Sequence, residues 1–131
     1  MHCRLQRLLL IFTRKVLHYD VRVGNLLLDK NLNLKLCDFQ GKILLPDGTV
    51  RLDGESAEDI KSSMPRSDPN DANQKTDIFA LGSAIYLIIK GHLPFLELDS
   101  WKDTLEIVSW FKSPQFPALD KKLGGVVVQK C

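Results

Sequence analysis

Two short segments decide the fold of this 131-residue chain: His18-Tyr19-Asp20-Val21-Arg22-Val23-Gly24-Asn25, followed by Leu34-Lys35-Leu36-Cys37-Asp38-Phe39-Gln40-Gly41. Between them, leucines at 26–28 and at 34 and 36 flank the polar turn 29–31. This pattern predicts a short β-hairpin. A hairpin returns the chain, so we expect Asp38 to lie beside the loop that carries Asn25.

Asp20, Asn25 and Asp38 are residue types that suit chemistry on a phosphate. Phosphoryl transfer depends mainly on positioning and charge neutralisation, and a carboxylate can accept the proton of an attacking hydroxyl. Amide and carboxylate oxygens are the hard ligands that Mg²⁺ prefers. Each residue alone is a weak signal, because short motifs often match by chance, so the prediction depends on their order and spacing.

The two segments resemble the catalytic loop and the metal-binding segment of eukaryotic protein kinases. The resemblance implies that Asp20 accepts the substrate proton and that Arg22 neutralises charge on the transferred phosphate. It implies further that Asn25 and Asp38 bind Mg²⁺ and that, with Leu27, they contact ATP. ATP and Mg²⁺ are therefore the expected cofactors.

The resemblance continues downstream. Residues 75–86 resemble the start of the central helix of the kinase large lobe, and 91–95 resemble the turn that follows it. The apolar run 78–89 predicts a helix buried on nearly every face. By resemblance, the Asp77 carboxylate holds the catalytic-loop backbone, while His18 and Phe39 are buried stacking partners. We expect His18 to be packed and hydrogen-bonded, not catalytic.

Further helices are expected on either side of this region. Leucines in the first twelve residues have helical spacing, Ser100 is a candidate cap for a helix ending at Phe111, and residues 123–131 resemble the beginning of a later kinase helix. The predicted fold class is α+β, mainly α-helical: a kinase-like C-terminal lobe with a short β-hairpin. Residues 1–131 would form one partial kinase-like domain, divergent and similar to fungal kinase-like proteins.

The small lobe is not expected within these residues. No Gly-x-Gly-x-x-Gly occurs in the sequence, and no strand before Asp20 carries the lysine that holds nucleotide phosphates in this family. We therefore expect ATP to bind the isolated chain weakly or not at all.

Three positions depart from the kinase pattern. Tyr19 replaces an arginine that contacts activation-segment phosphate in many kinases, and Gln40 replaces a glycine. Arg66 stands near the position of a glutamate, and its reversed charge predicts that the usual buried ion pair is lost. These departures leave three readings open: an active kinase segment, a kinase-like pseudoenzyme that serves as a binding or scaffold module, and a truncated product. The choice between serine/threonine and tyrosine substrates also stays open.

The composition limits the class of partner and the compartment that we expect. A net charge of +2 and the absence of a basic tract argue against a nucleic-acid surface, so the expected partner is a protein substrate or binding protein of unspecified identity. The three cysteines have no metal-ligand spacing, which favours free thiols in a reducing compartment. Without a predicted membrane span, the expected location is intracellular, cytoplasmic or nuclear.

Overall fold

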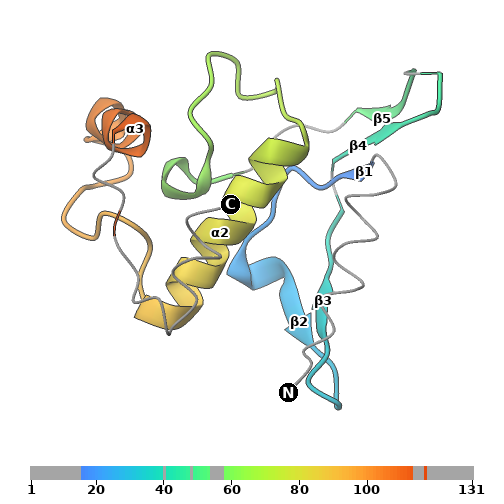
Figure 1. The fold of residues 1–131 in the computed structure, drawn as a ribbon, viewed down its shortest axis with the longest axis horizontal. Coiled ribbons are helices and arrows are strands. Elements are labelled where there is room, and N and C mark those ends of the chain that lie inside the picture. Colours follow the sequence, from blue (N-terminus) through green and yellow to red (C-terminus); the bar gives the residue numbers. More distant parts are fainter. Residues whose placement is uncertain (1–15, 40, 48, 54–57, 114–116, 118–131) are drawn as a thin grey trace.

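The computed structural model describes residues 16–39, 41–47, 49–53, 58–113 and 117. Within these residues, five short strands come first, interrupted by the 3₁₀ turn η1 (Val23–Asn25): β1 (Val16–Leu17), β2 (Leu26–Leu28), β3 (Leu34–Leu36), β4 (Lys42–Leu44) and β5 (Val50–Asp53). The 3₁₀ turn η2 (Ile60–Ser62) and the helices α2 (Gln74–Lys90) and α3 (Thr104–Lys112) follow. In Figure 1, α2 crosses the middle of the molecule, with the strands on one side and α3 on the other.

The strands form two separate antiparallel sheets. β2 pairs with β3 in the register Leu26 with Leu36 and Leu28 with Leu34, so the predicted hairpin is confirmed. The other sheet has the order β1-β4-β5, with a shift of register between Ile43 and Leu44. Helices and strands therefore both occur, as the α+β prediction requires.

Helix α2 begins and ends where its sequence provides caps. The side chain of Asn73 accepts the N–H of Lys75, and the Thr76 hydroxyl accepts the N–H of Asn73, which together form a capping box. At the other end, Gly91 adopts a left-handed conformation with a φ of 77° and donates its N–H to Leu87. The predicted helix is thus present: α2 begins one residue before position 75 and ends one residue after the apolar run 78–89.

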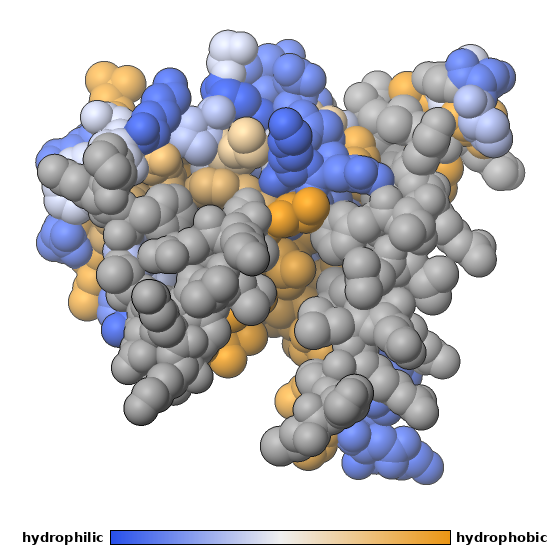
Figure 2. Space-filling view, viewed as in Figure 1, coloured by the Kyte–Doolittle hydropathy of each residue, from blue (hydrophilic) through white to orange (hydrophobic). Residues whose placement is uncertain are grey.

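The burial of α2 is less complete than its composition predicts. Its small and polar positions are buried, among them Ala80, Gly82, Ser83 and Ala84, but Ile88 is 59% exposed. Figure 2 shows hydrophobic surface in the middle of the molecule, where α2 runs, and polar residues along the upper edge. The expectation of a helix buried on every face is therefore wrong in its last turns.

An aromatic cluster joins α2 and α3. Phe95, Ile107 and Phe111 are its buried centre, and the rings of Phe79 and Trp110 meet phenylalanine edges at centroid distances of 5.0 and 5.2 Å. Such edge-to-face contacts add to the free energy gained by burying the rings. This cluster fixes the loop that connects the two helices against α2.

Ser100 does not cap α3, contrary to the sequence prediction. The Asp99 carboxylate accepts the N–H groups of Trp101 and Lys102, and Asp103 accepts the N–H of Asp99. These side-chain bonds compete with helix formation and hold the segment as a turn. The helix consequently begins at Thr104, with Asp103 at the cap position.

Candidate active site

Asp77, in the first turn of α2, anchors the loop around Asp20. Its two carboxylate oxygens accept the backbone N–H groups of His18 at 2.7 Å and Tyr19 at 3.0 Å, and the residue is only 1% exposed. Burial raises the pKa of this carboxyl, while the two backbone donors oppose that rise. The role predicted for Asp77 is confirmed: it holds the backbone immediately before Asp20.

Two residues near the anchor adopt a backbone conformation that L-residues rarely take. Tyr19 has a φ of 68° and is fully buried, and Asp38 has a φ of 61°. A bulky residue in the left-handed region persists only where its surroundings impose that conformation, which often happens at functional sites. Here, the bond from the Tyr19 N–H to Asp77 is one such constraint.

His18 links the Asp20 loop to the segment after the hairpin. Its Nδ1 atom accepts the N–H of Asp20 at 3.3 Å, and its Nε2 atom donates to the carbonyl of Cys37 at 2.9 Å. His18 is fully buried, as expected of a packed, hydrogen-bonded histidine. Its ring contacts Phe39 at a centroid distance of 4.5 Å, but Phe39 is 44% exposed, so the prediction of a buried Phe39 is wrong.

The Asp20 carboxylate is buried, and its two oxygens have different surroundings. Oδ2 lies 3.1 Å from Nε of Arg22 and accepts the side-chain N–H of Asn25 at 2.9 Å. Asn25 also donates to the Asp20 carbonyl at 2.8 Å. Oδ1 is buried and has no hydrogen-bond partner within the described part of the chain. The structure therefore brings Asp20, Arg22 and Asn25 together and leaves one buried oxygen of Asp20 without a hydrogen-bond partner among the described residues.

The hairpin brings the Asp38 segment back to Asn25. The N–H of Cys37 donates to the Asn25 carbonyl at 2.9 Å, and Asp38 follows directly with an exposed side chain. Leu27, on β2, is 53% exposed. The expected proximity of the Asp38 segment to the Asn25 loop is thus present.

The donor set fits a magnesium ion that is held partly by other ligands. The Asn25 side-chain nitrogen faces Asp20, so a cation would meet the amide oxygen, and the exposed Asp38 side chain lies on the segment that is hydrogen-bonded to Asn25. Among the described residues, no group of three or more acidic, histidine or cysteine side chains could hold a metal ion. Mg²⁺ is commonly bound in this way, by one or two protein oxygens together with phosphate and water.

A glycine that the sequence reasoning did not single out is required beside this site. Gln40 lies outside the described residues, but Gly41 is buried against β1, where an added Cβ would lie 1.8 Å from the carbonyl oxygen of Leu17. Only glycine permits so close an approach of two backbones. The signal in the sequence was the glycine itself, one position later than the kinase pattern has it.

A buried ion pair stabilises the segment before α2. Arg66 donates to Glu58 at 2.8 Å, with side chains 10% and 1% exposed, and also to Ser63 and the carbonyls of Met64 and Pro69. Burial raises the pKa of Glu58, and the guanidinium of Arg66 opposes that rise. The reversed charge at Arg66 therefore does not leave the segment without a buried ion pair, because Glu58 provides a partner eight residues earlier in the sequence.

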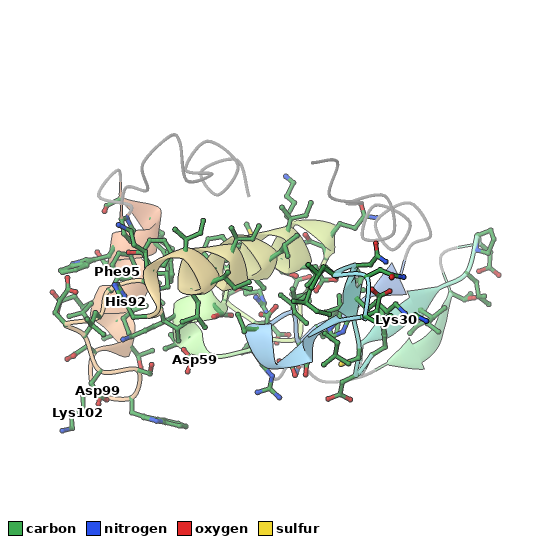
Figure 3. All side chains as sticks on the ribbon, turned by 90° about the horizontal axis from the view of Figure 1, so that it is seen from below. Lys30, Asp59, His92, Phe95, Asp99 and Lys102 are labelled. Carbon is green, nitrogen blue, oxygen red and sulfur yellow. The ribbon has the colours of Figure 1, made fainter. Side chains whose placement is uncertain are left out.

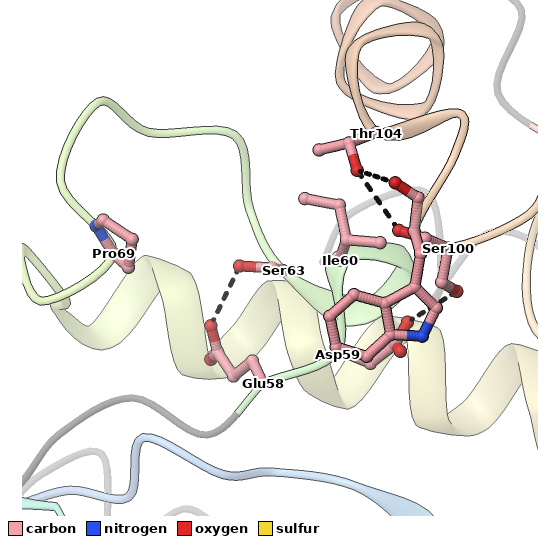
Figure 4. A pocket seen from close by; sticks show the side chains of 8 residues that line it. Glu58, Asp59, Ile60, Ser63, Pro69, Ser100 and Thr104 are labelled. Carbon is pink, nitrogen blue, oxygen red and sulfur yellow. Dashed lines mark hydrogen bonds between the residues drawn. The ribbon is translucent and has the colours of Figure 1, made fainter.

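Two pockets share part of their lining, and Asp20 lines one of them. One, of about 290 Å³, is lined by Asp20, Val21, Arg22, Glu58, Asp59, Ser62 and Trp101. The other, of about 310 Å³, shares Glu58, Asp59 and Trp101 and reaches Thr104. Figure 4 shows Glu58 and Ser63 on one side of this second pocket, Ser100 and Thr104 on the other, and Asp59 between them. Sequence reasoning missed Asp59 and Trp101, which come from separate loops.

Comparison with known proteins gives similarity to protein kinases. The chain is 31% identical over 109 residues to a "probable serine/threonine-protein kinase" of Dictyostelium discoideum, 32% over 90 residues to an Aurora kinase of Eremothecium gossypii, and 30% over 81 residues to the sucrose non-fermenting protein kinase 1 of Fusarium virguliforme. These matches cover 78%, 64% and 62% of the chain, but only 11%, 23% and 12% of the relatives. No protein-family model matches the sequence. Within the described residues, no helix is long and apolar enough to cross a membrane.

Proposed function

We propose that this chain, a divergent protein-kinase-like segment, forms the acceptor and metal side of a kinase active site in the large lobe, where a phosphoryl group passes from ATP to a protein hydroxyl. The observation that carries the proposal is the Asp20 carboxylate. Its Oδ2 atom is held by Arg22 and Asn25, and its buried Oδ1 atom faces no donor among the described residues while the side chain lines a pocket.

Asp20 acts as the proton acceptor. A serine, threonine or tyrosine hydroxyl entering the pocket donates its hydrogen bond to Oδ1, a buried acceptor that has no partner among the described residues. Asn25 and the loop anchored by Asp77 fix the carboxylate, so little reorganisation is needed when the substrate binds. The fixed geometry orients the hydroxyl oxygen toward the phosphate.

Arg22 and the hairpin provide the remaining groups. The Arg22 side chain is 57% exposed, so its guanidinium can turn from Asp20 toward a phosphate and neutralise charge. Asn25 and Asp38 would hold Mg²⁺, which supplies charge neutralisation on the phosphates when bound. Leu27 offers exposed apolar surface to the nucleotide base. No glycine-rich loop occurs in the 131 residues, so phosphate binding by this segment alone is weak.

A second candidate is a binding or scaffold module without turnover. The observation that favours it is the ion pair of Arg22 with Asp20, which occupies one oxygen of the proposed base with a cation of the same loop. In that case, the pocket beside Asp20 would bind a protein segment and release it unchanged.

Phosphoryl transfer by a fusion protein tests the proposal. A small lobe from a related protein kinase, with its glycine-rich loop, is joined to this chain, and transfer from ATP to a serine peptide is measured with magnesium. Asp20→Asn should lower kcat roughly 100-fold or more with little change in ATP affinity, because the side chain handles the proton and not the metal. Asp38→Asn should raise the magnesium concentration needed and weaken ATP binding. A well-folded fusion with no turnover above its Asp20→Asn control supports the binding module instead.

A further inference from the structure

Trp101 is the most exposed large apolar side chain among the described residues, at 92%. Its backbone is nevertheless fixed, because its N–H and that of Lys102 both donate to the Asp99 carboxylate, at 2.9 and 3.0 Å. A tryptophan whose backbone is fixed and whose ring faces solvent offers a π-face at low cost in conformational entropy. Such residues are enriched where proteins bind one another.

The charges around the pocket beside Asp20 leave one acidic group uncompensated. Four charged residues line it, and two of them, Asp20 and Arg22, pair with each other at 3.1 Å. Glu58 pairs with Arg66 at 2.8 Å. Asp59 is the fourth, and it makes no ion pair with any residue that the structure describes. Within the described part of the chain, the pocket therefore presents one carboxylate that forms no ion pair.

Asp59 is held next to the tryptophan loop. Its Oδ1 atom accepts the N–H of Lys61 at 2.9 Å and lies 3.5 Å from the hydroxyl of Ser100, the residue before Trp101. Asp59 and Trp101 both line both pockets. In Figure 3, Asp59 lies on the lower side of the molecule, left of the middle, and Asp99 and Lys102 lie further to the lower left. A carboxylate and an aromatic face thus meet at one opening.

Lys61 fixes the two loops relative to each other. Its buried ammonium group, on the turn that Asp59 caps, donates to the carbonyls of Phe95 and Leu98. Phe95 belongs to the aromatic cluster between α2 and α3. The distance between Asp59 and the loop of Trp101 is therefore set by buried bonds.

We propose that Asp59 and Trp101 form a subsite for the lysine or arginine side chain of a polypeptide whose acceptor hydroxyl lies at Asp20. The carboxylate attracts the cation, and the indole face binds it by a cation–π interaction. The side chain of Asp20 lines the same pocket, and under the proposed function it marks the place of the acceptor hydroxyl. That placement rests on the proposed function, whereas the cation subsite does not depend on turnover. An acidic segment would be repelled by Asp59.

Chemical-shift titration of the isotope-labelled 131-residue chain tests the subsite. The probes are alanine-based peptides with one central serine and a single arginine moved along the positions on either side, each paired with a peptide that carries neutral citrulline instead of arginine. The dissociation constant comes from the backbone amides of residues 59–62. The indole N–H of Trp101 should shift on binding, and that of the half-buried Trp110 provides an internal control.

Matched variants separate the charge from the ring. Asp59→Asn keeps an N-cap oxygen for Lys61 and removes only the charge, so it should weaken binding of the best arginine peptide about threefold to fivefold and abolish its advantage over citrulline. Trp101→Ala should weaken the same peptide by about threefold, and Trp101→Phe by less. Asp68→Asn changes another exposed turn aspartate outside both pockets and should have no effect.

Each outcome decides the proposal. Equal affinity for arginine and citrulline peptides, no binding of either, or an arginine preference that survives Asp59→Asn overturns it. The preference should persist when the central serine is replaced by alanine, because the cation and the hydroxyl occupy different places. Arginine preference without phosphoryl transfer in the fusion protein contradicts the proposed function only; transfer without arginine preference contradicts the subsite only.

Discussion

The two walls of the pocket beside Asp20 are built in different ways. On one wall, Asp20 is 1% exposed and its loop is held by Asp77, from a helix that begins more than fifty residues later. On the other wall, Trp101 is 92% exposed and Asp59 faces solvent. Hydrogen bonds nevertheless fix the backbone there, from the N–H of Lys61 to Asp59 and from the N–H of Trp101 to Asp99. Chemistry requires a rigid, desolvated group, whereas recognition of varied side chains requires an accessible one. Under the proposed function, we infer that the wall around Asp20, here called the chemical wall, serves the first task, and that the wall with Asp59 and Trp101, here called the recognition wall, serves the second.

Removing Arg66 should have the largest effect on stability, because the recognition wall rests on its ion pair with Glu58. Arg66→Met removes the cation from the Glu58 carboxylate, whose side chain is only 1% exposed. The free energy of unfolding should fall by about 3 to 5 kcal/mol. The double variant Glu58→Leu/Arg66→Met should recover most of that loss, since no buried charge remains. Urea unfolding of the three proteins measures the effect, and a double variant as unstable as Arg66→Met would show that the charge is not the cause.

Asp77→Ala tests the anchor of the chemical wall. The variant leaves the buried N–H groups of His18 and Tyr19 without acceptors, so its free energy of unfolding should fall by about 3 kcal/mol. Asp20→Ala should lower the free energy of unfolding less. It removes the partner of the Arg22 and Asn25 side chains but leaves no backbone N–H without an acceptor. Equal urea midpoints for the two variants would contradict the anchoring role of Asp77.

Gly41→Ala tests whether the backbone contact beside the chemical wall is as close as the structure shows. The added methyl group would meet the Leu17 carbonyl, so β4 must shift from β1 at a cost of about 2 kcal/mol. Gly24→Ala is the matched control, since nothing lies within 4 Å of its added Cβ. Thermal unfolding compares the two variants, and equal melting temperatures would contradict so close a contact between Gly41 and Leu17.

Asp29→Asn, in the hairpin turn, should produce the smallest change in the free energy of unfolding, and that change should depend on pH. Hydrogen bonds from Asn33 lower the pKa of its carboxyl from 3.8 to about 2, so its ionised form stabilises the fold above 3.8 and loses that contribution as the pH falls through about 2. The difference in unfolding free energy between wild type and Asp29→Asn should therefore shrink as the pH is lowered through this range. A difference that stays constant would exclude this linkage.

Local sequence patterns predicted the secondary-structure elements around Asp20. The leucines around 29–31 specify the hairpin, and the apolar run with its polar start and Gly91 specifies α2. The contact of Asp77 with the Asp20 loop spans nearly sixty residues, and only the resemblance to kinases supplied it. The Ser100 cap prediction failed because Asp99 captures the next two N–H groups, a competition that helical periodicity does not reveal.

The recognition wall could not be predicted from local patterns. Asp59 and Ser100 are 41 residues apart, and Glu58 and Arg66 meet across a turn with no repeating pattern. Their proximity results from tertiary packing of the aromatic cluster and from Lys61, which binds carbonyls 34 and 37 residues away. The exposure of Trp101 likewise depends on the tertiary structure, because the hydrophobicity of a tryptophan side chain alone would favour burial.

Steady-state kinetics of the fusion protein tests the division between the two walls most directly. With a serine peptide that carries the preferred arginine, Asp20→Asn should lower kcat roughly 100-fold or more and leave KM for the peptide nearly unchanged. Asp59→Asn should instead raise KM for that peptide about threefold to fivefold and lower kcat little. Loss of kcat in both variants, or in neither, would contradict the assignment of chemistry to the Asp20 wall and recognition to the Trp101 wall.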